Sequence, residues 1–76
     1  MNELLEILKS VREDVDFENE EKLIDDSVLD SFDIIAIVSE LNDHYGIEIT
    51  ADDLLPENFN SASAILKLVN RLKESA

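Results

Sequence analysis

Cysteine is absent from this chain of 76 residues, so neither a disulfide framework nor a thiolate metal site can form. Glycine and proline occur once each, which favours helices over strands and turns. The longest apolar run, Ile34 to Val38, is far too short to span a membrane. The first residues, Met-Asn-Glu, are acidic rather than basic, so we expect no ordinary signal peptide.

Basic residues are also scarce. Six Lys and Arg stand against 19 Asp and Glu, which gives a formal net charge of −13. Such a surface repels phosphate backbones and anionic lipid, so we expect neither nucleic-acid binding nor membrane insertion. The 45% of hydrophobic residues argues against wholesale disorder. We therefore expect one acidic domain over 1–76 that is soluble, cytoplasmic and monomeric, and the lack of Gly/Pro/Ser-rich ends favours a free-standing protein.

Three segments with a period of about 3.6 residues predict an all-α bundle of three main helices. The first helix is predicted over 3–15, with Asn2 as its N-cap. The second begins at Asp30 or Ser31 and ends at Tyr45, and the last runs from its cap at 60 or 61 to about 73. Ile65, Leu68, Val69 and Leu72 form the buried stripe of this last helix.

Spacing also predicts the shorter features. Asp30 and Asp33 have the spacing of a capping box, and Gly46 suits the position just after a helix end. Thr50 and Asp53 repeat the capping spacing, so a short helix is predicted over 51–55, stopped by Pro56. Residues 16–30 lack periodicity, and we expect a long loop packed on the core. The side chains expected to hold that loop are Phe17, Leu23, Ile24, Val28 and Leu29.

Catalysis within the chain is not expected. The one histidine, His44, follows Ser31 by thirteen residues on the same predicted helix, a separation of about 20 Å. Ser31 therefore has no histidine base within reach, which excludes a hydrolase triad. The acids of 25–33 lack the calcium-loop pattern and are interpreted as surface acids, so no metal site is expected.

The predicted second helix has one unusual residue. Its core side is formed by Ile34, Ile37, Val38, Leu41 and Tyr45, and the opposite arc contains Phe32, Asp33, Ala36, Ser39, Glu40 and Asp43. Phe32 is a large aromatic on the polar side. Two readings stay open: it docks a partner with a basic rim, or it folds back on the loop at 28–29.

The charges are unevenly distributed. Between Lys22 and Lys67 there is no Lys or Arg, but there are ten Asp and Glu. One pole of the domain, centred on the second helix, is therefore almost purely anionic. A charge run is commonly a solvated face, but here it coincides with Phe32 and with the exposed start of a helix.

Residues 29–32, Leu-Asp-Ser-Phe, open an acidic helix after a long loop and resemble the Asp-Ser-Leu attachment motif of acyl and peptidyl carrier proteins. The segments 45–49 (Tyr-Gly-Ile-Glu-Ile) and 52–59 (Asp-Asp-Leu-Leu-Pro-Glu-Asn-Phe) are similar to those that follow the second helix in that family, and the likeness extends over nearly the whole chain. The resemblance implies a helical carrier-protein fold of three long helices and one short one.

The resemblance further implies that Ser31 receives 4′-phosphopantetheine from coenzyme A through a separate, magnesium-dependent phosphopantetheinyl transferase. The chain would then present acyl or aminoacyl thioesters to partners, namely an adenylating enzyme that activates the acid and a downstream acyltransferase or synthase. It would not be an enzyme. The residues expected to dock these partners are Asp30, Phe32, Asp33, Ala36, Ser39, Glu40 and Asp43.

Two residues depart from the family pattern: Phe32 replaces the usual Leu or Met, and Val28 stands where many relatives have Gly. The form of 28–31 is nearer to the D-alanine carrier and to stand-alone biosynthetic carriers than to the fatty-acid carrier. The cargo and the pathway, fatty-acid or secondary-metabolite biosynthesis, stay open. The alternative function is a non-enzymatic acidic interaction module, such as a nucleic-acid mimic without a prosthetic group.

Overall fold

The computed structural model describes residues 2–75, and every regular element in that range is helical. These residues form the helices α1 (Asn2–Val11), α2 (Ser31–Tyr45), α3 (Pro56–Phe59) and α4 (Ala62–Ser75), with a 3-10 turn, η1 (Ala51–Asp53), before α3. The predicted all-α class, with three main helices, one short helix and a long first loop, is confirmed.

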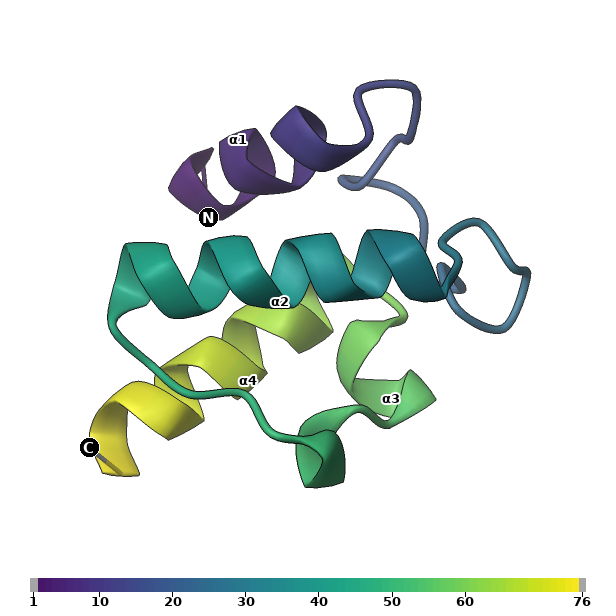
Figure 1. The fold of residues 1–76 in the computed structure, drawn as a ribbon. Coiled ribbons are helices and arrows are strands. Elements are labelled where there is room, and N and C mark those ends of the chain that lie inside the picture. The colour runs from purple at the N-terminus through teal and green to yellow at the C-terminus, as the bar shows by residue number, and fades with distance from the viewer. Residues whose placement is uncertain (1, 76) are drawn as a thin grey trace.

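Helix α2 packs against both α1 and α4 (Figure 1). It runs antiparallel to α1, since Glu3 of α1 pairs with His44 near the end of α2, while Arg12, just after α1, pairs with Asp33 near its start. At the end of α4, Lys73 Nζ lies 5.5 Å from the centre of the Tyr45 ring. The start of α1 and the end of α4 therefore lie beside the C-terminal end of α2, and the first turn of α2 lies at the other end of the molecule (Figure 1).

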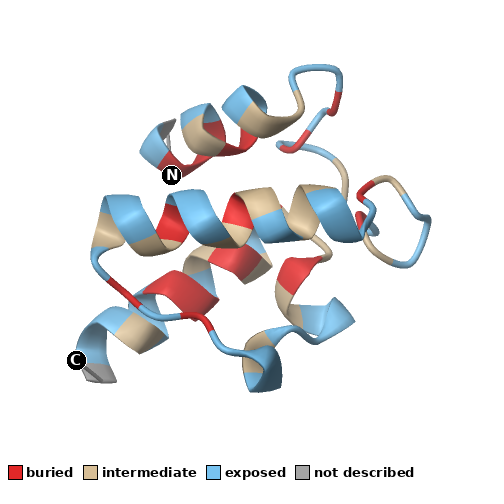
Figure 2. Ribbon diagram, in the orientation of Figure 1, coloured by how far each residue is buried: buried red, intermediate tan, exposed pale blue. Residues whose placement is uncertain are grey.

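The core is one cluster of apolar side chains to which every α-helix contributes. Figure 2 shows the positions of the buried residues in red along the ribbon. The loops also supply members, of which Phe17 is the largest. No polar or charged side chain is buried in the described part of the chain. The fold is thus held by apolar burial, worth about 1.5–3 kcal/mol for each large side chain removed from water.

Helix α1 ends four residues earlier than predicted. The predicted helix extended to Val15, but α1 ends at Val11, and Val15 is buried from a turn. After the helix, Arg12 makes two hydrogen bonds to the carboxylate of Asp14. Side chains two residues apart do not face each other on a helix, so this pair forms only where the chain has left helical geometry.

The loop between α1 and α2 is packed on the core, as predicted. Leu23 and Leu29 are buried together with Phe17, and Ile24 and Val28 pack against the same cluster. Backbone hydrogen bonds join the loop to itself and to the junction of α3 and α4: Leu29 N donates to Leu23 O (3.0 Å), and Leu23 N donates to the backbone oxygen of Asn60 (2.9 Å).

Helix α2 has the predicted boundaries. Asp30 is its N-cap and forms a capping box with Asp33, and Gly46 follows the helix in the left-handed conformation (φ 64°) that glycine adopts without strain. The following chain returns to the core, because Ile47 and Ile49 are buried.

The short helix is not where the sequence placed it. Thr50 and Asp53 do form the predicted capping box, but they cap only the 3-10 turn η1. The prediction that Pro56 stops a helix is wrong, since Pro56 is the first residue of α3. Proline is favoured there because its missing N–H would have no acceptor in the first turn of a helix.

Helix α4 begins after Ser61, whose hydroxyl accepts a hydrogen bond from Ala64 N at 3.0 Å. Ser61 is therefore the N-cap, one of the two residues predicted. The predicted stripe of α4 faces the core: Ile65, Leu68 and Val69 are buried, and Leu72 packs partly against them.

Candidate functional site

Ser31 is the first residue of α2 and is exposed. Within residues 2–75 its hydroxyl takes no part in a hydrogen bond. The backbone N–H groups of Ser31 and Phe32, in the first turn, have no acceptor inside the helix. Free N–H groups and the positive end of the helix dipole favour an anionic group at this position. A phosphate ester on Ser31 therefore fits the local backbone.

The backbone around Ser31 is fixed by its two neighbouring acids. Asp33 N donates to Asp30 Oδ1 at 2.9 Å, and Asp30 N donates to Asp33 Oδ2 at 3.2 Å. Each acid thus satisfies one backbone donor that the helix leaves unpaired. Since Ser31 lies between these two residues, the capping box sets the direction in which its side chain leaves the helix.

The Asp33 carboxylate is less exposed to a docking partner than the sequence predicted. Arg12 Nη1 donates to Asp33 Oδ2 at 2.6 Å, and the Asp33 side chain is only 14% exposed. The helical wheel indicates the reason: Asp33, Ile37 and His44 fall along the edge of α2 that faces α1. The placement of Asp33 on an open polar arc was therefore wrong. Its carboxylate is largely covered.

Phe32 is 81% exposed. The alternative in which it folds back on the loop at 28–29 is therefore wrong. Ile35, one turn further along α2, is also 64% exposed, and it is not among the docking residues predicted from the sequence. The wheel contained the signal, because Ile35 falls about 100° from the centre of the apolar stripe, on the same side as Phe32. Two large apolar side chains thus face solvent beside Ser31.

The other predicted members of the polar arc lie on the same helix. Ser39, Glu40 and Asp43 are exposed, Ala36 is half-buried, and Asp30 is exposed at the N-cap. The exposed side of α2 therefore offers an apolar patch with carboxylates beside it. Such a surface suits a partner that has an apolar pocket and basic residues around it.

A small apolar cavity of about 100 Å³ lies near the start of α2. Ile34 forms its α2 wall and Ile24 its loop wall. The remaining walls come from the segment 54–59, where Leu54 and Leu55 are each more than two-fifths exposed.

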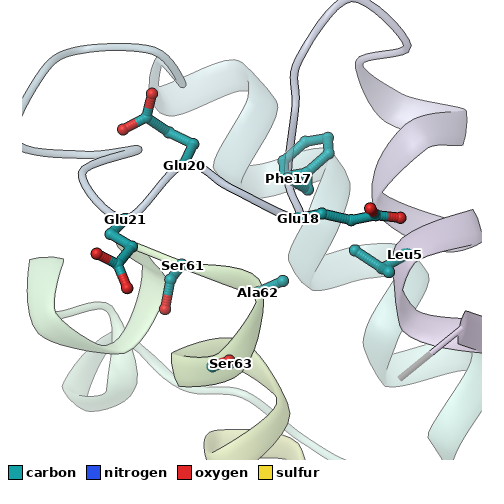
Figure 3. A pocket seen from close by; sticks show the side chains of 8 residues that line it. All are labelled: Leu5, Phe17, Glu18, Glu20, Glu21, Ser61, Ala62 and Ser63. Carbon is teal, nitrogen blue, oxygen red and sulfur yellow. The ribbon is translucent and has the colours of Figure 1, made fainter.

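A larger open hollow of about 380 Å³ lies elsewhere, between the first loop and the start of α4 (Figure 3). Its lining includes three glutamates of the loop, Glu18, Glu20 and Glu21. Leu5, Phe17 and residues 61–63 at the start of α4 complete the lining. None of its lining residues belongs to α2. This hollow is therefore separate from the surface around Ser31.

His44 is exposed, as predicted, and its Nε2 lies 2.8 Å from Glu3 Oε1. In residues 2–75 no three His, Asp or Glu side chains are grouped to hold a metal ion. None of the helices described is long and apolar enough to cross a bilayer.

The hydrogen bond from Arg12 lowers the pKa of the Asp14 carboxyl, and the bonds to Asp14 and Asp33 raise the pKa of Arg12.

Comparison with known protein families gives one finding. The model of a family described as a phosphopantetheine attachment site matches residues 2–69, which is most of the chain. No curated protein and no solved structure matches significantly.

Proposed function

Since this chain belongs to the family of phosphopantetheine attachment domains, we propose that Ser31 is the residue to which the group is attached. Members of the family are carriers that hold 4′-phosphopantetheine covalently and do not themselves catalyse reactions. One observation carries the assignment to Ser31: it is an exposed serine at the first position of a capped helix, where free backbone N–H groups favour a phosphate.

In the attachment reaction this chain supplies the nucleophile, and the transferase supplies the base that accepts its proton. Ser31 Oγ attacks the β-phosphorus of coenzyme A, an Oγ–P bond forms, and the bond to the departing 3′,5′-ADP breaks. The hydroxyl proton passes to a base of the transferase, because His44 lies near the other end of α2 and is paired with Glu3. Once attached, the group supplies a thiol on a flexible arm, which holds cargo as a thioester.

We further propose that the exposed side of α2 is the surface that partners recognise. Phe32 and Ile35 enter an apolar pocket of the partner, and Asp30, Glu40 and Asp43 meet its basic rim, with Ala36 and Ser39 between them. Asp33 contributes through the helix cap, since its carboxylate pairs with Arg12. The partners proposed are a phosphopantetheinyl transferase, an adenylating enzyme for an acid or amino acid, and an acyltransferase or synthase.

Residues 1–76 are proposed to act as a single carrier domain. The family match over 2–69 and the single apolar core of the described residues both support this. The cargo is proposed to be an acyl or aminoacyl group.

The test is the intact mass of the protein after reaction with coenzyme A and a phosphopantetheinyl transferase. The wild type is expected to gain one phosphopantetheine, and Ser31→Ala is expected to gain none. Ser63→Ala is the control, because Ser63 is an exposed serine on α4, outside the proposed docking surface, and this variant is expected to be modified. An unmodified wild type would instead favour an acidic interaction module without a prosthetic group.

A further inference from the structure

Arg12 joins the end of α1 to the first turn of α2, and we propose that it is a positioning residue for the modification of Ser31. The inference rests on the proposed function and goes beyond it, because it assigns a role to a residue outside α2, just after α1. Arg12 does not contact the reacting atoms. It acts through Asp33, the residue that closes the capping box on the far side of Ser31.

The contact is made at one particular oxygen. Asp33 Oδ2 accepts the hydrogen bond from Asp30 N that completes the capping box, and the same oxygen accepts the bond from Arg12 Nη1 at 2.6 Å. A charged donor on this oxygen limits the rotation of the carboxylate. The carboxylate in turn holds the backbone N–H of the residue directly before Ser31.

Arg12 is itself fixed. Its Nε donates to Asp14 Oδ1 at 2.9 Å and its Nη2 donates to Asp14 Oδ2 at 3.0 Å, so one edge of the guanidinium is held in a two-point contact. The remaining nitrogen, Nη1, points to Asp33. This use of two edges needs the planar fork of arginine, which the single ammonium of a lysine cannot reproduce.

The charge of Arg12 matters because of where it lies. No Lys or Arg occurs between Lys22 and Lys67, so α2 has neither, and Arg12 brings a cation to its first turn. The arriving phosphate of coenzyme A is anionic, and the capping box holds the carboxylates of Asp30 and Asp33 at the turn that carries Ser31. Pairing with Arg12 lowers the repulsion from Asp33 and keeps the serine oriented, which is the part of catalysis that a carrier protein can supply.

The experiment compares modification kinetics of four proteins: wild type, Arg12→Gln, Arg12→Lys and Lys22→Gln. Lys22→Gln is the matched control, because it loses the same charge from the exposed loop and leaves α2 untouched. All are assayed well below their melting temperatures, with the kcat and KM of the transferase for each carrier measured separately. For Arg12→Gln we expect kcat to fall roughly tenfold, while Lys22→Gln keeps the wild-type kcat. Arg12→Lys is expected to fall between them.

A second comparison tests whether Arg12 acts through Asp33. If Arg12 acts by holding that carboxylate, adding Arg12→Gln to Asp33→Asn causes no further loss of kcat. The inference is overturned if Arg12→Gln and Lys22→Gln have the same kcat, or if Arg12→Gln lowers only the melting temperature, or if the two losses multiply in the double variant. A wild type that takes up no phosphopantetheine would instead refute the proposed function, and this inference would fall with it.

Discussion

Asn60 holds Asp25 across 35 residues of sequence by two hydrogen bonds. Its Oδ1 accepts from Asp25 N at 3.1 Å, and its Nδ2 donates to Asp25 Oδ2 at 3.3 Å. The same Oδ1 also accepts from Ile24 N at 3.0 Å. The loop that leads to Ser31 is thereby fastened to the junction of α3 and α4, next to the apolar cavity that Ile24 lines.

Asn60→Ala should therefore destabilise the protein. Two backbone N–H groups lose their acceptor, one of them partly buried, and we expect a loss of about 1–3 kcal/mol in the free energy of unfolding. Urea denaturation measures it. Asn19→Ala is the control, because the Asn19 side chain bonds only the exposed Asp16, and it should change stability by less than about 0.5 kcal/mol. Equal effects for the two variants would contradict the role given to Asn60.

Phe32→Ala should separate recognition from folding. Because Phe32 is 81% exposed, its truncation should cost well under the roughly 3–5 kcal/mol of a core Phe→Ala substitution, while modification of Ser31 slows. Phe59→Ala is the matched comparison, since Phe59 is buried and should lose that full amount. Denaturant midpoints and modification rates of both variants check this. Unfolding of Phe32→Ala would place the residue in the core.

Glu40→Lys should slow modification by weakening encounter with the transferase. Glu40 is exposed on α2, so its reversal should scarcely alter stability, and the loss should appear in kcat/KM and shrink as ionic strength rises. Rates at low and high salt measure it, with Glu74→Lys on α4 as the control of equal charge change. If both reversals have the same effect, the acidic side of α2 has no special part in recognition.

The same reversal at Asp33 should behave differently. Its carboxylate is covered, completes the capping box and pairs with Arg12, so Asp33→Lys should destabilise the fold, where Glu40→Lys does not. The lost cap alone is worth about 1 kcal/mol. Thermal melts of the two variants measure the difference. Matching melting temperatures would mean that the Arg12 pair and the cap contribute nothing.

Tyr45 should lose its phenolic proton at a higher pH in the folded protein than in the unfolded chain. Burial, and to a smaller extent the charge of Glu3, raises the pKa of Tyr45 above its usual value. A raised pKa favours the neutral phenol, so the contribution of Tyr45 to stability is complete below the unfolded pKa of about 10 and is lost as the pH rises through the folded pKa. Tyr45 is the only tyrosine, so its phenolate absorbance reports it directly. Equal midpoints in native and denatured protein would contradict the shift.

Features that depend on one turn of chain were predicted correctly from the sequence. The capping box of Asp30 and Asp33, the start of α2 at Ser31 and its end before Gly46 all follow from residues no more than four apart. The buried stripe of α4 follows from periodicity in the same way. These elements are determined locally because backbone donors are satisfied by the nearest side chains.

The errors arose where two local signals competed or where a contact was distant. The apolar period of α1 continued to Val15, but the helix ends at Val11 and Arg12 pairs with Asp14 just beyond it. Pro56 is compatible with either the end or the start of a helix, and its neighbours in the sequence do not distinguish these two positions.

The surroundings of Ser31 were decided by the tertiary structure. The wheel left Phe32 between loop and solvent, and only the path of the packed loop exposes it. The wheel also placed Asp33 among exposed acids, but the antiparallel packing of α1 brings Arg12, 21 residues away in sequence, to the Asp33 carboxylate. The sequence alone determined that a capped helix begins at Ser31, since that depends on neighbours within a turn. Which neighbouring charges are covered depends on how the helices pack, because burial and pairing are set by side chains that meet only in the folded chain.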